Sequence, residues 1–113
     1  MSCPAKEGWR VLKRLPKKIK GWTVAQSQQQ HIALDKVLEI CAMNANCYGV
    51  NYNYEEELEV MVLGRNGAQN TEYGVPLVSA ECFYEPYETT RIQASKLKKD
   101  DGYFKGYSED ALE

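Results

Sequence analysis

The sequence predicts a single small α+β domain braced by disulfide bonds, and three observations lead to that prediction. The chain has 113 residues, which suits one hydrophobic core and is too short for two of ordinary size. One segment has the apolar spacing of a helix, and the segment after it alternates like a strand. Four cysteines in a short chain are compatible with two bridges in an oxidising compartment, although four reduced cytosolic thiols would give the same composition.

Composition and charge indicate a folded, soluble protein. Hydrophobic residues make up 43% of the chain and charged residues 27%, with a formal net charge of −2, which argues against disorder. No apolar run approaches the about 20 residues that cross a bilayer, so we expect no membrane span. The first residues lack the order of a signal peptide, and the ends of the chain indicate no compartment.

Helical spacing is clearest between residues 34 and 42. Leu34, Val37, Leu38, Cys41 and Ala42 follow the i, i+3, i+4, i+7, i+8 pattern, which places them on one face of an amphipathic helix. Before this stripe, the segment from 27 to 30 has the pattern of a capping box, in which Ser27 and Gln30 cap each other's backbone amides. We expect the helix to end at 44–46, where two asparagines occur.

The remaining pattern predicts strands. Residues 9–15 and 21–25 are read as two extended pieces, and residues 47–54 as a strand in which Tyr48, Val50, Tyr52 and Tyr54 point one way. A charged turn leads to a second strand at 58–63, which gives a hairpin. Residues 64–74 are expected to form a loop, residues 75–87 another strand, and residues 90–99 a short helix in a weakly patterned tail.

In the predicted order of elements, a helix with a cysteine near its end is followed by a short asparagine-containing loop and then by a strand, which reads Cys47-Tyr48-Gly49-Val50-Asn51-Tyr52-Asn53-Tyr54. This order resembles the PAN/apple domain family. The resemblance covers roughly residues 3–87. It implies one amphipathic helix packed on a twisted antiparallel sheet, with 1–87 as the domain and 88–113 as a C-terminal extension packed on it or trailing it. It also implies an extracellular module that binds proteins or carbohydrates.

The resemblance further implies a pairing of the cysteines. Cys41 and Cys47 match a family bridge from the helix to the next strand, and Cys3 and Cys82 lie where a terminal pair is expected. The family's other helix cysteine would fall at Val37, and its partner near residues 60–62, so both halves of that bridge are absent together. Packed aliphatic side chains can replace part of such a bridge.

No group of residues predicts catalysis, a cofactor or a metal. The single histidine, His31, lies beside no cysteine or carboxylate at ligand spacing, and no close cysteine knuckle for zinc occurs. The carboxylates Glu55, Glu56, Glu57 and Glu59 lack the order of a calcium loop and are read as a solvated turn. We therefore expect a protein that is not an enzyme.

Two features could serve binding. The first is a basic stripe that could meet an anionic polymer such as a sulfated glycan, although an ordinary solvated segment is the favoured interpretation. The second is an aromatic row that could stack on sugars or anchor a protein, although one or two of its rings are expected in the core. The stripe consists of Lys13, Arg14, Lys17, Lys18 and Lys20, and the row of Tyr48, Tyr52 and Tyr54, together with Tyr84 and Tyr87.

Three functional hypotheses follow. The first is a non-enzymatic extracellular or secreted adhesion module that recognises a glycan or a protein. The second is a structural or self-assembling protein, in which the basic stripe of one copy meets the acidic residues 55–59 of another. The third is a small cytosolic thiol protein acting through Cys41 or Cys47, which requires a free thiol. Nucleic acid is an unlikely partner because the chain is acidic overall.

Overall fold

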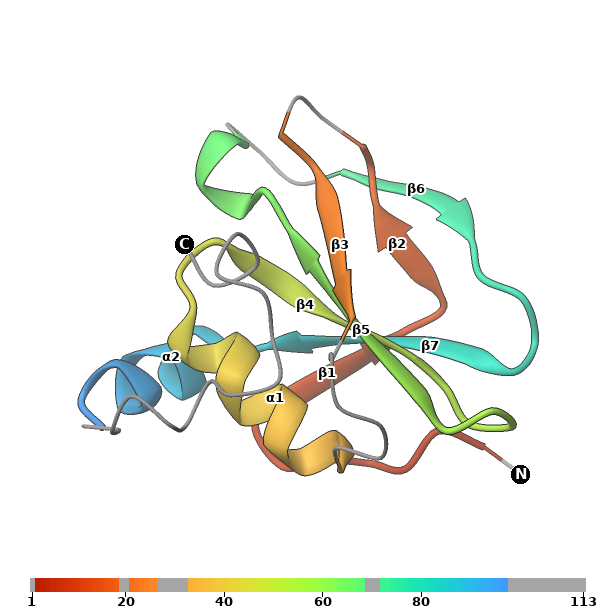
Figure 1. Ribbon diagram of the computed structural model, residues 1–113, viewed down its shortest axis with the longest axis horizontal. Helices are drawn as coiled ribbons and strands as arrows, with labels where there is room; N and C mark the ends of the chain where they lie inside the picture. Colours follow the sequence, from red (N-terminus) through yellow and green to blue (C-terminus); the bar gives the residue numbers. More distant parts are fainter. Residues whose placement is uncertain (1, 19–20, 27–32, 69–71, 98–113) are drawn as a thin grey trace.

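The computed structural model describes residues 2–18, 21–26, 33–68 and 72–97, which form an α+β fold with two helices on an antiparallel sheet (Figure 1). The helices are α1 (Leu34–Met43) and α2 (Glu88–Ser95). The main sheet has five strands in the order β1-β7-β4-β5-β3, and each neighbouring pair is antiparallel. These strands are β1 (Trp9–Leu12), β3 (Thr23–Gln26), β4 (Cys47–Asn53), β5 (Leu58–Leu63) and β7 (Glu81–Pro86).

The predicted hairpin is formed by β4 and β5, whose residues pair from Cys47 with Leu63 to Asn53 with Leu58. Its turn lies at the expected glutamates. The side-chain Oδ1 of Asn53 accepts hydrogen bonds from the backbone amides of Glu55 and Glu56, at 3.0 and 3.1 Å. This asparagine therefore fixes the turn through its own side chain.

A second, two-stranded sheet corrects two sequence predictions. The segments 9–15 and 75–87 were each predicted as one strand, but each divides between two sheets. β1 is followed by β2 (Arg14–Pro16), and β7 is preceded by β6 (Tyr73–Pro76), which begins inside the predicted loop. β2 pairs with β6, and the amide of Leu77 donates to the carbonyl of Lys13 at 2.8 Å where the chain leaves the main sheet.

Apolar clusters cover both faces of the main sheet. One cluster contains the buried side of α1 and also Val50, Met61 and Tyr84 from the strands. The other cluster contains Tyr48, Val62 and Phe83, with residues from the two-stranded sheet and its flanks packed against it. The sheet is thus the middle layer, between the helices and the small sheet.

A β-bulge in β4 reverses its side-chain alternation. The register shifts between Cys47 and Gly49, and Tyr48 belongs to the cluster on the small-sheet side. Val50 belongs to the cluster on the helix side, and Tyr52 packs against that cluster. The prediction that Tyr48 points the same way as these residues is therefore wrong, because a bulge adds one residue and moves side chains to the other face.

Helix α1 matches the predicted apolar stripe and end. Its residues Val37, Leu38, Ile40, Cys41 and Ala42 are buried, and Asn44 is its C-cap. The described helix begins at Leu34, and no side chain hydrogen-bonds at its N-cap, Ala33. The predicted capping box at residues 27–30 lies outside the described residues.

Helix α2 lies in the segment expected as a C-terminal extension. It begins two residues earlier than the helix predicted for 90–99, and it packs against α1. Arg91 and Ala94 are buried, and the Arg91 guanidinium Nη2 donates to the carbonyls of Cys47 and Tyr48 at 2.6 and 3.2 Å. The start of the extension is thus fastened to the bulge of β4, while residues 98–113 lie outside the described residues.

Two disulfide bonds brace the fold. Cys3 is joined to Cys82 with the Cα atoms 6.3 Å apart, and Cys41 to Cys47 with the Cα atoms 5.4 Å apart, which is the pairing that the resemblance implies. The first bond ties the N-terminal segment to β7, and the second joins the end of α1 to the start of β4. Neither described helix has the length and apolar character needed to span a membrane.

Candidate binding surface

The basic stripe lies along the two-stranded sheet. Lys13 precedes β2, Arg14 begins it, and Lys17 and Lys18 follow it, whereas Lys20 lies outside the described residues. All four described side chains belong to exposed residues. The stripe is therefore a surface feature, but its members differ in what they contact.

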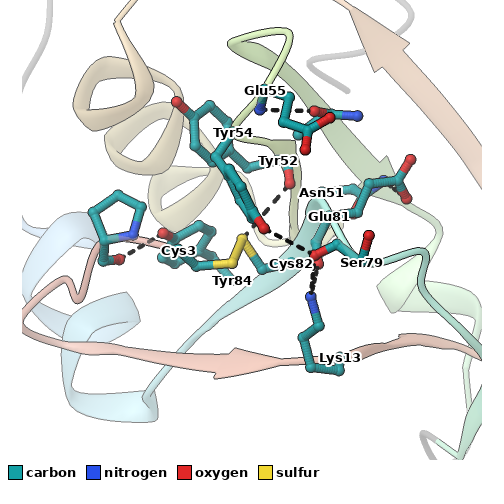
Figure 2. Close-up of a disulfide and its surroundings, with 12 residues drawn as sticks. Cys3, Lys13, Asn51, Tyr52, Tyr54, Glu55, Ser79, Glu81, Cys82 and Tyr84 are labelled. Carbon is teal, nitrogen blue, oxygen red and sulfur yellow. Dashed lines mark hydrogen bonds between the residues drawn. A yellow bond between two sulfur atoms is a disulfide. The ribbon is translucent and has the colours of Figure 1, made fainter. Parts of the chain in front are cut away.

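Lys13 and Arg14 hold the protein's own backbone. The Lys13 ammonium donates to the carbonyl of Ser79 at 3.1 Å and also to the carbonyl of Glu81 (Figure 2). The Arg14 Nη1 donates to the carbonyl of Gly74 in β6 at 2.8 Å. An anionic ligand would have to compete with these bonds, so these two cations are poorer ligand contacts than their exposure suggests.

Lys17 and Lys18 border an apolar groove between β2, β6 and Trp22, which directly precedes β3. The groove has a volume of about 410 Å³. Val75, on one wall, is 74% exposed. The groove is lined by Leu15, Pro16, Lys17, Lys18, Trp22, Gly74 and Val75. We call this feature the β2–β6 groove.

Both lysines at the β2–β6 groove have loose partners. The Lys17 ammonium lies 3.5 Å from a carboxylate oxygen of Glu72, but both side chains are 65% exposed, where an ion pair contributes little. The Lys18 ammonium lies 4.9 Å from the centre of the Trp22 ring, a cation–π geometry. A ligand carboxylate could approach either ammonium without breaking a strong bond.

Trp22 is the largest side chain in this groove. Its indole Nε1 is buried and has no hydrogen-bond partner within the described part of the chain. A buried indole donor usually has a hydrogen-bond partner. Because this N–H group is buried, it is not an accessible donor for a ligand in the groove. The groove consequently offers to a ligand the ring of Trp22 and an aliphatic surface, with the positive charges of the lysines at its edge.

The aromatic row does not form one surface. Tyr48 is 4% exposed and packs beneath the small sheet. Tyr52 packs against the helix-side core. The Tyr54 hydroxyl donates to the Ser79 carbonyl at 3.2 Å, the same carbonyl that Lys13 binds (Figure 2). These three tyrosines, predicted together as a binding row, therefore point to three different surroundings.

The other two tyrosines of the predicted row, Tyr84 and Tyr87, also lie in different surroundings. Tyr84 is fully buried, and its hydroxyl donates to the carbonyl of Pro4 at 2.5 Å. Burial, and then the neighbouring Tyr52 and Asp35, raise the pKa of Tyr84 to about 12. Tyr87 is exposed, and the guanidinium of Arg10 lies 5.9 Å from the centre of its ring.

The acidic hairpin is only partly a surface patch. Glu55, Glu56 and Glu57 are exposed at the turn, whereas Glu59 is only 8% exposed. No group of three or more His, Cys, Asp or Glu residues that could hold a metal ion occurs among the described residues. All four cysteines are in disulfide bonds, so thiol chemistry would first require reduction.

Trp22 and Val75 are two of the groove residues that the sequence did not reveal as candidates. They lie 53 positions apart, and each was read only as part of an extended segment. Val75 reaches the groove because β6 pairs with β2, a pairing that the strand predictions for 9–15 and 75–87 excluded. No local pattern carries that information.

Comparison with known proteins identifies no relative of this chain. No family model, curated protein or solved structure matches the chain. Membership of the PAN/apple family therefore stays a hypothesis that depends on the residues from Cys41 to Tyr54 and on the two cysteine pairs.

Proposed function

We propose that the protein is a non-enzymatic extracellular module of the PAN/apple type that binds a protein partner through the β2–β6 groove. The observation that carries this proposal is an open apolar groove bordered by two exposed lysines. Two disulfide bonds are compatible with an extracellular protein. The helix-on-sheet arrangement agrees with the PAN/apple resemblance at the coarse level of an α+β fold.

The charges and the lining define the partner's chemistry. The walls offer apolar contacts, so the inserted group is an aliphatic or aromatic side chain. The ammonium groups of Lys17 and Lys18 at the rim favour an acidic residue next to it. A sulfated glycan fits less well, because Lys13 and Arg14 already bind backbone carbonyls and the stripe offers fewer free charges than its sequence suggests.

A random heptapeptide library displayed on phage tests the proposal without a known partner. Peptides selected on the intact, oxidised protein are expected to pair an acidic residue with a large apolar one. Their binding should fall about tenfold or more with Val75→Asp or Lys18→Glu, because a charge then enters an apolar wall or reverses at the rim. Val78→Asp is the matched control, since Val78 is also exposed, at 63%, and does not line the groove.

Three results would overturn this function. They are a selection that yields no consensus, peptides that bind the Val75→Asp variant as well as the original protein, and equal losses with the Val78→Asp control. Retention on immobilised heparin that disappears in moderate salt and with Lys17→Glu plus Lys18→Glu would replace the protein partner by a sulfated glycan. Concentration-dependent dimers weakened by the same double variant would instead favour self-assembly.

A further inference from the structure

A second cavity lies beside the start of α2 and shares no lining residue with the β2–β6 groove. Its volume is about 250 Å³, and three arginines from separate elements line it. They are Arg10 of β1, Arg65 of the short 3₁₀-helix η1 (Arg65–Gly67), and Arg91 of α2. Their positions are too far apart in the sequence for any motif to reveal them.

Arg91 is a buried cation that lacks a counter-ion in the described part of the chain. The residue is only 9% exposed, and none of the ion pairs among the described residues includes it. Its Nη2 donates to two backbone carbonyls, whereas its Nη1 is buried and has no partner among the described residues. An unpaired buried charge is costly, so an anion nearby would stabilise this arrangement.

The carboxylates lining the cavity already have other partners. A carboxylate oxygen of Glu88 lies 3.7 Å from the Arg65 guanidinium, and the Glu85 carboxylate accepts a hydrogen bond from the Tyr73 hydroxyl. Three arginines face two glutamates in the lining, which leaves one positive charge in excess. Burial, and then the charge of Arg65, lower the pKa of Arg91 to about 10, against the smaller opposite effect of Glu88 and Glu85.

We propose that this cavity binds one oxyanion group, of the carboxylate, sulfate or phosphate class. Guanidinium groups bind such groups through paired N–H donors, and three of them around one cavity can share the oxygens. The volume suits a single small group. Arg10 and Arg65 would contact the anion from the rim, and Arg91 would supply positive charge from the buried side.

Thermal unfolding in added anions tests the site. Sulfate, phosphate and acetate are each titrated into the intact oxidised protein at constant ionic strength, with chloride as the balancing salt. We expect a saturable rise in Tm with at least one of the three, and the most effective one identifies the class. Tyr48 and Glu88 are among the residues that line the cavity, and their backbone amide signals should shift in the NMR spectrum over the same concentrations.

Arg65→Gln is the decisive variant, because Arg91 also holds β4 and its loss could unfold the protein. We expect this variant to weaken the apparent affinity about tenfold or more. Lys96→Gln removes the same charge at the end of α2, outside the cavity, and should leave the affinity unchanged. The site does not exist if all three anions act like chloride, or if Arg65→Gln and Lys96→Gln weaken the response equally.

Discussion

At the scale of single residues, Gly49 shows how the backbone of one strand dictates the side chain of another. A Cβ atom at this position would lie 2.1 Å from the carbonyl oxygen of Tyr84 and 2.6 Å from the Phe83 ring. Both neighbours belong to β7, which pairs with β4 in the middle of the sheet. Only glycine allows β7 to approach the bulge this closely.

Gly49→Ala should therefore lower the free energy of unfolding by about 3 kcal/mol or more, because the methyl group meets backbone that cannot move without breaking the sheet. Urea unfolding measures the change. Gly21→Ala is the control, since Gly21 also resists substitution, with φ of 84°, but a Cβ there has open space. We expect the control to lose only about 1 kcal/mol. Equal losses in the two variants would mean that close approach is not the cause.

The raised pKa of Tyr84 makes its contribution to the free energy of unfolding depend on pH, and the direction of the shift fixes the sign of that dependence. Its pKa in the fold, about 12, exceeds the ordinary value of 10.0. Below that ordinary value the hydroxyl is protonated in both states. Above it the unfolded chain loses the proton first, so the stabilisation disappears as the pH rises towards the folded pKa.

The variant Tyr84→Phe should be less stable than the original protein by about 1 kcal/mol near neutral pH, because the hydrogen bond to Pro4 is lost. The difference should shrink as the pH passes above about 10. Urea unfolding of both proteins from about pH 8 to about pH 11 measures it. If the difference in unfolding free energy stays constant over this range, ionisation of the Tyr84 hydroxyl is not the cause of the loss of stability at alkaline pH.

At the scale of elements, the sequence identified what local spacing determines. The apolar stripe of α1 and the β4–β5 hairpin were predicted because helical spacing and strand alternation are properties of adjacent residues. The bulge at Cys47–Gly49 was missed, because a register shift is a property of the pairing between β4 and β5 and not of adjacent residues. The pairing of β2 with β6 was missed for the same reason, and the β2–β6 groove was missed with it.

Introducing the disulfide bond that the PAN/apple family has and this chain lacks tests whether α1 packs on β5 as in that family. Val37 lies where the resemblance places a helix cysteine, and residues 60–62 are where it places the partner. Of these three, Met61 belongs with Val37 to the helix-side cluster, and both residues are fully buried. We expect Val37→Cys combined with Met61→Cys to form a third disulfide bond under oxidising conditions, detected in a non-reducing peptide map. A bond requires the two Cα atoms to lie within about 7 Å.

Val37→Cys combined with Val62→Cys is the matched control. Val62 is the next residue along β5 and is equally buried, but it belongs to the cluster on the opposite face of the sheet. This pair should stay reduced, because side chains of adjacent strand residues point to opposite faces. If neither pair forms a bond, or if both do, α1 does not lie over β5 as a PAN/apple helix would.

At the scale of the whole molecule, the two disulfide bonds close loops of very different length. Cys3 and Cys82 are separated by 79 residues, whereas Cys41 and Cys47 are separated by 6. On the chain-entropy model, a bond restricts the unfolded chain more when it closes a longer loop. The Cys3–Cys82 bond also joins the N-terminal segment to the central sheet, which the short bond does not.

Replacing both members of each pair by alanine separates loop entropy from packing. We expect the Cys3→Ala, Cys82→Ala protein to lose about 4 kcal/mol of unfolding free energy and the Cys41→Ala, Cys47→Ala protein about 2 kcal/mol. Packing alone predicts the opposite order, because Cys41 and Cys47 are both fully buried while Cys3 is only partly buried. Urea unfolding of the two variants decides between them: equal losses, or a larger loss for the short loop, would assign the stabilisation to packing and strand geometry instead of the closed loop.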